Sequence, residues 1–326
     1  MIFIAILHAI QYSGFLAAQV TNATLLYLIV TRARSLFGSY RYVMGTFALY
    51  SLLYAWIEVL TQPVMHIVGP VFVVYMDSPL KYETLIGKDL TSEFLNSSNI
   101  SLFAALYCGS FALVISLLAS QFFYRFIVFC HPEIMRYFDG WHLTRIFIPC
   151  VICFISWFEI VYYWMANTRE KQLYLKRELA DYYDEDSEKV TFIGPMYWSV
   201  GENGERIWKI GEIMGSVGCV TIILVCFSTI VFCAFNIYYK LKSVSNTLSC
   251  KSFDLNHQLF MTLTFQTLLP FVMMYSPVGL LITLPFFEIS VGRAANFVGA
   301  SLAVYPALEP LIAIFCIKDF RKALFC

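Results

Sequence analysis

Seven long stretches with almost no charge divide this chain, and they limit its fold more than any other feature. A helix needs about 20 mostly apolar residues to cross the hydrocarbon core of a bilayer. Away from the ends of the stretches, the only charged residues are Glu58, Glu159 and Glu309. The stretches predict spanning helices at approximately residues 5–31, 42–65, 98–126, 143–166, 212–239, 257–284 and 294–316.

The composition is that of a membrane protein. Hydrophobic residues make up 59% of the 326 residues and charged residues only 13%, whereas a soluble protein carries about a quarter charged residues. The first stretch is too long for the core of a signal peptide, so we expect an uncleaved anchor. We therefore expect an all-α integral membrane protein with one domain at residues 1–326, a seven-transmembrane bundle followed by a short amphipathic helix at residues 317–326. The net charge of zero gives no argument for a nucleic-acid partner.

Lysine and arginine are distributed unequally between the two sides of the predicted bundle. The short segments on the side of the N-terminus carry only Lys81, Lys88 and Arg293, and those on the other side carry many more. The positive-inside rule then places the N-terminus outside and the C-terminus inside. The sequons at Asn96 and Asn99 would lie outside, where we expect glycosylation.

Two predicted outer segments lie next to the mouth of the bundle. Pro63 and Gly69-Pro70 are expected to end the second helix and to leave residues 66–75 in an outer loop. The loop at residues 167–211 is long, and its acidic centre is typical of a solvated charge run. The alternative is a lid over a binding site, because the loop borders the mouth of the bundle.

The predicted inner end of the third helix carries a motif. Tyr124-Arg125-Phe126 is followed by Cys130 and Pro132. This resembles the Asp-Arg-Tyr-x-x-x-Cys-x-Pro signature of rhodopsin-like G-protein-coupled receptors, with Tyr124 in the place of the Asp. The alternative for Arg125 is an anchor that holds a helix end at the lipid headgroups.

The end of the chain resembles the same receptors. An acid-proline pair in the seventh helix is followed by a basic amphipathic segment, and the residues concerned are Glu309, Pro310, Lys318, Phe320, Arg321 and Lys322. Such a segment is typical of a helix that lies in the membrane interface. Glu309 stands where those receptors carry Asn or Asp. In the sixth helix, Pro270 predicts a kink, which is either a lever whose inner end swings or a static bend.

Further segments resemble one family of this superfamily, the nematode str-class chemoreceptors, which include the odorant receptor for diacetyl. The resemblance covers nearly the whole chain and rests on residues 39–44, 63–67, 202–204, 266–270, 285–287, 295–297 and 305–310. It implies an olfactory receptor in the plasma membrane of sensory cilia, with a small-molecule odorant and a heterotrimeric G protein as partners. It also implies that the residues for G-protein coupling and switching are Tyr124, Arg125, Phe126, Pro270, Glu309, Pro310, Lys318, Arg321 and Lys322.

The sequence excludes two ligand classes. The seventh helix has no lysine for a retinal Schiff base, and the third helix has no acid to pair with an amine. The remaining apolar and aromatic bundle suits a small neutral ligand. An acid inside the membrane is a candidate functional residue, and we expect the ligand-binding residues among Glu58, Tyr107, Glu159 and Asn296. The alternative is a protonated Glu58 bonded between helices and an outward-facing Glu159.

Other classes of function receive less support. The five histidines lie on both sides without paired acids at metal spacing, so we expect no metal, no cofactor and no enzymatic activity. The competing function is a ligand-gated cation channel of the inverted seven-helix type, whose N-terminus would lie inside. The distribution of Lys and Arg opposes that orientation. The outer loop at residues 167–211 contains no cysteine, so the disulfide that rhodopsin-like receptors form there is impossible.

Overall fold

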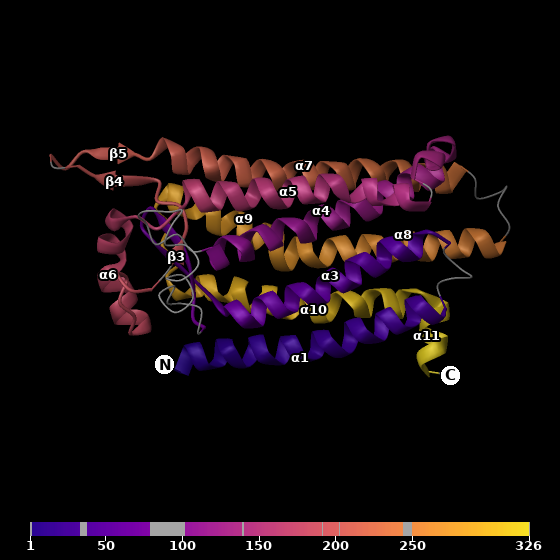
Figure 1. Cartoon of the computed structure of the whole chain (residues 1–326), viewed down its shortest axis with the longest axis horizontal. Coiled ribbons are helices and arrows are strands. Elements are labelled where there is room, and N and C mark those ends of the chain that lie inside the picture. The colour runs from indigo at the N-terminus through magenta and orange to yellow at the C-terminus, as the bar shows by residue number, and fades with distance from the viewer. Residues whose placement is uncertain are drawn as a thin grey trace.

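The computed structural model describes residues 2–32, 38–78, 102–138, 140–190, 192–201, 203–243 and 250–325. The sequons at Asn96 and Asn99 lie outside the described residues. In the described part of the chain, seven helical segments are long and apolar enough to cross a membrane. They run side by side as one elongated bundle (Figure 1). The predicted fold class, a seven-transmembrane helix bundle, is confirmed.

The spanning segments contain the following elements: α1 (Ile2–Thr31), α3 (Tyr40–Thr61), α4 (Leu102–Cys130), α5 (Ile148–Glu159) with the π-helical η5 (Ile160–Trp164), α7 (Ile210–Ser243), α8 (Cys250–Pro270) with the π-helical η6 (Phe271–Tyr275), α9 (Ser276–Thr283) with η7 (Leu284–Phe287), and α10 (Asn296–Cys316). The short 3-10 helices are η3 (Pro132–Phe138), η4 (Gly140–Phe147) and η8 (Arg293–Ala295). The amphipathic tail forms α11 (Lys318–Phe325), which turns away from the bundle axis in Figure 1.

Several helix ends differ from the prediction by a few residues, and at two of them a proline lies just beyond the end. The second spanning helix ends at Thr61 instead of residue 65, because Gln62 adopts a left-handed conformation with a φ of 44° and Pro63 cannot continue the hydrogen bonds. The third continues past residue 126 to Cys130 and ends before Pro132. The end of this helix therefore extends one turn beyond Arg125.

The third spanning helix, α4, is the most buried of the spanning helices and lies at the centre of the bundle. It packs against α3, α5 and α7, whereas α1 packs along α10 and α3. Gly14 permits the close approach of α1 to α10, because a Cβ at this position would lie 2.5 Å from the carbonyl oxygen of Ala303. Small residues at such contacts are a general feature of helix packing in membranes.

Two prolines interrupt the sixth spanning segment. The chain widens into the π-helical η6 directly after Pro270. Pro277 has no N–H to give to the carbonyl of Met273, one turn earlier. The hydroxyl of Ser301 in α10 donates a hydrogen bond to that carbonyl over 2.6 Å. The interrupted segment is therefore tied to the seventh spanning helix at its break.

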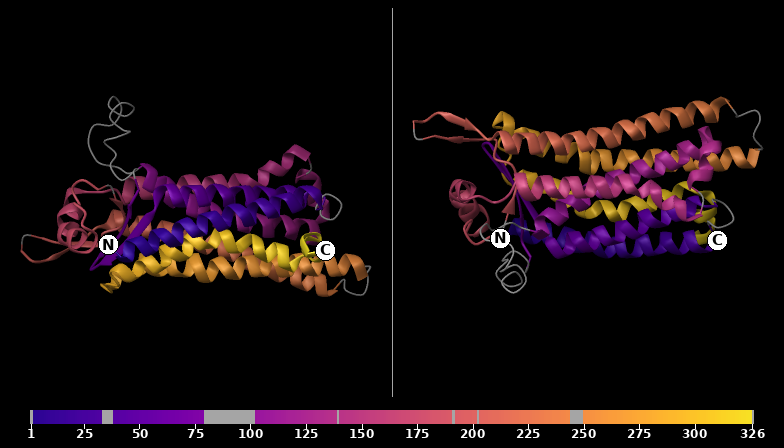
Figure 2. Two further views of the ribbon diagram at one scale, coloured as in Figure 1. Left: turned by 90° about the horizontal axis from the view of Figure 1, so that it is seen from below. Right: turned by 45° about the horizontal axis from the view of Figure 1, so that its top comes forward.

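A folded unit, which we call the cap, covers the end of the bundle that holds the N-terminus. It consists of β1 (Pro63–Val68), β2 (Val71–Met76), α6 (Arg169–Tyr183), β3 (Phe192–Ile193), β4 (Trp198–Val200) and β5 (Arg206–Trp208). The first three strands form one antiparallel sheet in the order β1-β2-β3, and β4 pairs with β5 in a separate hairpin. Figure 2 shows the cap and the C-terminus at opposite ends of the molecule.

The loop predicted at residues 167–211 is folded, so a solvated charge run describes it incompletely. Leu175 and Leu179 of α6 are fully buried in one cluster with Val73 and Phe192 of the sheet. Both β1 and β2 are buried on their two faces, so their sequences lack the alternation that predicts a strand. The cap is therefore held by an apolar core of its own.

Candidate functional site

A cavity of about 60 Å³ lies between the bundle and the cap. Its walls come from α4, α5 with η5, α7, α9 and α10, and the cap closes it from the N-terminal end. The lining residues are Met65, Phe72, Val74, Tyr107, Cys108, Phe111, Trp157, Val161, Met165, Ile193, Gly194, Pro195, Cys219, Val278, Ile282 and Leu302. Tyr107 carries the one hydroxyl among these described residues, so the wall is almost entirely apolar.

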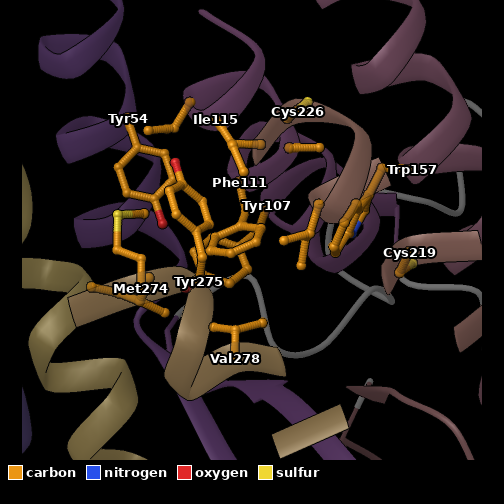
Figure 3. Packing of buried hydrophobic residues seen from close by; sticks show 14 of the residues in the cluster. Tyr54, Tyr107, Phe111, Ile115, Trp157, Cys219, Cys226, Met274, Tyr275 and Val278 are labelled. Carbon is orange, nitrogen blue, oxygen red and sulfur yellow. The ribbon is translucent and has the colours of Figure 1, made fainter. Parts of the chain in front are cut away.

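A row of aromatic rings packs beside the cavity, from Tyr54 on one side to Trp157 on the other (Figure 3). The rings of Tyr54 and Tyr107 are stacked, with centroids 6.5 Å apart. Phe111 contacts Trp157 at 5.6 Å and Tyr275 at 5.3 Å. Because Tyr275 belongs to η6, the rings connect the cavity directly to the break in the sixth spanning segment.

Polar atoms without partners gather next to these rings. Both carboxylate oxygens of Glu58 are buried beside Tyr54 and Tyr107, and the hydroxyls of both tyrosines are buried too. The hydroxyls of Tyr275 and Tyr305 complete the group, and none of these atoms has a partner in good hydrogen-bond geometry among the described residues. Leaving such a group unpaired costs about 1–3 kcal/mol. Groups of this kind are places where a buried water or a ligand supplies the missing bond.

The structure separates the four predicted ligand-binding residues. Tyr107 lines the cavity, and Glu58 is buried beside it without lining the cavity. Glu159 is exposed on the outer face of the bundle and takes no part in the cavity wall. Asn296 is buried beneath the cap, where its side-chain oxygen accepts the N–H of Met65 at 2.8 Å. Asn296 therefore supports the cap from below.

The cap supplies lining residues that the sequence analysis did not identify. Residues 193–195 come from the long loop, and Met65, Phe72 and Val74 come from the β1–β2 hairpin. One signal was present in the sequence, because the apolar stretch at residues 42–76 is too long for one spanning helix. Its excess of apolar residues forms the hairpin that closes the cavity.

His66 joins the cap to the bundle through neutral side chains. The Tyr183 hydroxyl accepts a hydrogen bond from Asn296 at 3.2 Å and lies 3.0 Å from Nδ1 of His66. If the Tyr183 hydroxyl donates its proton to Nδ1 of His66, the proton of the neutral imidazole lies on Nε2. That Nε2–H then faces the Glu178 carboxylate, 3.4 Å away. Burial lowers the pKa of His66, although Glu178 opposes this, and burial raises the pKa of Tyr183 to about 12. Both groups are therefore neutral at pH 7.

At the opposite end of the bundle, Arg125 packs on tyrosine rings. Its guanidinium lies 4.2 Å from the ring centroid of Tyr40, at the start of α3, and Tyr40 stacks on Tyr124 at 5.6 Å. Such a cation–π contact contributes about 0.5–2 kcal/mol. The Nη2 atom of Arg125 is buried and has no hydrogen-bond partner among the described residues. The second spanning helix thus restrains Arg125 through an aromatic ring.

A narrow crevice lies beside Arg125, between α4, α7 and α8. It is lined by Arg125, Phe129, Ile237, Leu241, Asn256, Phe260 and Leu263. Phe126 packs against Phe232 of α7, with centroids 5.6 Å apart. Any movement of the α8 end away from α4 would widen this crevice and uncover Arg125.

Buried polar side chains fasten α10 to its neighbours. Gln266 of α8 donates a hydrogen bond to the fully buried carboxylate of Glu309. Pro310 has no N–H for the carbonyl of Pro306, one turn earlier, and Asn22 of α1 donates to that carbonyl over 2.8 Å. The acid-proline pair of the sequence is therefore the point where α10 meets both α1 and α8.

The amphipathic helix α11 is docked on the end of the bundle. Phe320 is fully buried, and the Nζ atom of Lys318 lies 2.7 Å from the Asp254 carboxylate of α8. Arg321 and Lys322 are exposed. This end of the molecule therefore presents cations beside the crevice-forming helix α8.

Comparison with known proteins assigns the chain to a family. The family model described as "Serpentine type 7TM GPCR chemoreceptor Str" matches residues 7–325. The chain is 30% identical to the Serpentine receptor class r-10 of Caenorhabditis briggsae, over 96% of this chain and 87% of the relative, and 30% identical to that of Caenorhabditis elegans, over 93% and 85%. It is 26% identical to the G-protein coupled receptor str-33 of Caenorhabditis elegans, over 95% of this chain and 87% of the relative. Because the family model covers nearly the whole chain, and the chain folds as a seven-helix bundle, the chain belongs to the Str family of serpentine seven-transmembrane chemoreceptors.

Proposed function

We propose that this chemoreceptor binds a small neutral odorant in the cavity under the cap and activates a heterotrimeric G protein at the Arg125 end. The observation that carries the proposal is the cavity wall, which is almost entirely apolar and in which Tyr107 and Trp157 are the residues with an O–H or N–H in the side chain. A compact apolar molecule with one hydrogen-bonding group suits such a wall. A charged ligand would lose its hydration without gaining an ionic partner from the described lining residues.

The proposal includes an orientation and a location. The cap faces the outside, and the Arg125 end faces the cytoplasm of a sensory cilium, with the protein embedded in the plasma membrane. The distribution of Lys and Arg in the short segments supports this orientation. The exposed cations Arg321 and Lys322 of α11 suit the cytoplasmic leaflet, whose lipids are anionic.

The sixth spanning segment offers the path between the two sites. Val278 and Ile282 of α9 line the cavity, and Tyr275 of η6 packs on the adjoining rings. A ligand shifts a conformational balance only by binding one arrangement more tightly than the other. In the proposed active arrangement, the α8 end moves outward at the break, so that Arg125 can donate to backbone carbonyls of the G protein.

The test is ligand-evoked G-protein activation, normalised to receptor at the cell surface, after a screen of volatile compounds on cells with a reporter. Val278→Trp should fill the cavity and remove the response. Leu280→Trp is the matched control, because Leu280 lies on the same short helix but is 56% exposed. Tyr107→Phe should weaken potency roughly tenfold or less, as expected for one hydrogen bond. A normal response from Val278→Trp would place the ligand elsewhere.

A further inference from the structure

We infer that the buried ion pair of Lys171 and Glu212 is a latch that holds the cap over the cavity and thereby limits the size of the ligand. This inference rests on the proposed ligand site, although its test needs neither an odorant nor a G protein. Lys171 lies in the first turn of α6, and Glu212 lies in the first turn of α7. Their charged atoms are 2.8 Å apart, and the Lys171 side chain is 1% exposed.

The Lys171 ammonium uses all of its donors. In addition to the contact with Glu212, it donates to the carbonyl of Ala166 at 2.9 Å and to that of Gly194 at 2.8 Å. An ammonium has three donors, so this cation is fully paired, which is what its burial requires. The same Glu212 oxygen accepts the N–H of Met196. One ion pair thus holds four segments of the chain together.

The latch forms hydrogen bonds with the segment that closes the cavity. Gly194 and Pro195 line it, and the Gly194 N–H donates to the Met165 carbonyl at 3.0 Å while its own carbonyl accepts from Lys171. Gly194 has a φ of +149°, and a Cβ there would lie 1.9 Å from the carbonyl oxygen of Phe72. Only glycine fits so close to the sheet. The position of this segment is therefore fixed by the Lys171 bond and by close backbone packing.

No covalent bond shares this task, because residues 167–211 contain no cysteine. A second ion pair in the cap provides a contrast. Lys209 and Glu170 are 2.6 Å apart, but their side chains are 30% and 46% exposed, and their contact does not include Gly194. Exposed pairs of this kind contribute little to stability. Two Lys–Glu pairs of the same cap thus differ in burial and in contact with the cavity roof.

The experiment compares two double variants of the full-length receptor in lipid nanodiscs. Lys171→Met/Glu212→Leu removes both buried charges together, which avoids leaving one charge unpaired in the interior. Lys209→Met/Glu170→Leu is the matched control. The probe is alkylation by N-ethylmaleimide, followed by mass spectrometry of two thiols in α7. Cys219 lines the cavity, whereas Cys226 is buried without lining it.

We expect Cys219 to react at least tenfold faster in the Lys171→Met/Glu212→Leu variant, with the rate of Cys226 unchanged and with both rates unchanged in the control. The bulkier N-phenylmaleimide should react much more slowly than N-ethylmaleimide with Cys219 of the wild type, and at a similar rate in the variant. Unchanged Cys219 rates, or an equal acceleration of both thiols, would refute the latch. Since no signalling is measured, a failed odorant screen would refute the proposed function alone.

Discussion

The two ends of the bundle are held together by different interactions. At the cap, strand pairing, the His66 contacts and the fully paired Lys171 connect the segments through many directed bonds. At the opposite end, Arg125 rests on the ring of Tyr40, and its Nη2 atom has no hydrogen-bond partner in the described part of the chain. Directed polar networks separate only when several bonds are lost together, whereas a cation on a ring can change partner at small cost. This difference suits the proposed function, in which the cap end encloses the ligand and the Arg125 end exchanges contacts with the G protein.

The largest effect tests which end faces outward. If the cap is outside, Asn96 and Asn99 carry glycans, so glycosidase treatment should shift the mobility of the expressed receptor. The double variant Asn96→Gln/Asn99→Gln should abolish the shift completely. Antibody staining of a C-terminal epitope on intact cells would reverse the assignment of the two ends and favour the inverted channel.

The next effect concerns the exchange of contacts by Arg125. Arg125→Ala should leave surface delivery intact and reduce G-protein activation about a hundredfold or more, because alanine has none of the N–H donors of the guanidinium group. Arg125→Lys, which retains the charge, should fall between. Arg136→Ala is the control, since Arg136 is an exposed residue stacked on Tyr137 near the same end. Full activation by Arg125→Ala at matched expression would reduce Arg125 to a membrane anchor.

A smaller effect is expected from the ring that restrains Arg125. Tyr40→Leu removes the cation–π contact and should raise ligand-independent activity about two- to fivefold, which corresponds to 0.5–1 kcal/mol. Tyr40→Phe retains the ring and should resemble the wild type. Tyr42→Leu is the control, because Tyr42 makes a similar contact with Arg41 but is exposed. Equal basal activity in the Tyr40 and Tyr42 variants would show that the stacking restrains nothing.

The smallest effect concerns the pH dependence of the cap. Because burial lowers the pKa of His66, the unfolded chain binds its proton more readily than the folded chain. The stabilising contribution of neutral His66 is therefore complete above the ordinary pKa of about 6.5 and is lost as the pH falls towards the lowered value. The protection factors of β1 in hydrogen exchange, which divide out the intrinsic pH dependence of amide exchange, should fall between pH 7.5 and 5.5. His66→Gln should remove this fall, and the exposed His142→Gln should not.

The sequence predicted the bundle well because the bilayer allows few alternatives. Each spanning segment must satisfy its own backbone, so a long apolar stretch implies a helix. The cap has no such constraint. Lys171 lies in a charged loop that suggests full hydration, and its burial depends on carbonyls at Ala166 and Gly194 that only the folded chain brings together. Glu58 and Glu159 show the same limit, because both are single acids in apolar helices and only packing decides which of them faces inward.

The proline breaks have a consequence for recombining receptors of this kind. The donor that Pro277 cannot give to Met273 comes from Ser301 of α10, and the donor that Pro310 cannot give to Pro306 comes from Asn22 of α1. In each case the carbonyl and the side chain that donates to it lie on different helices. A chimaera that imports one of these helices without its neighbour would remove this side-chain donor from a carbonyl that lies in the hydrocarbon region. A chimaera should therefore exchange α1, α10 and the interrupted sixth segment together.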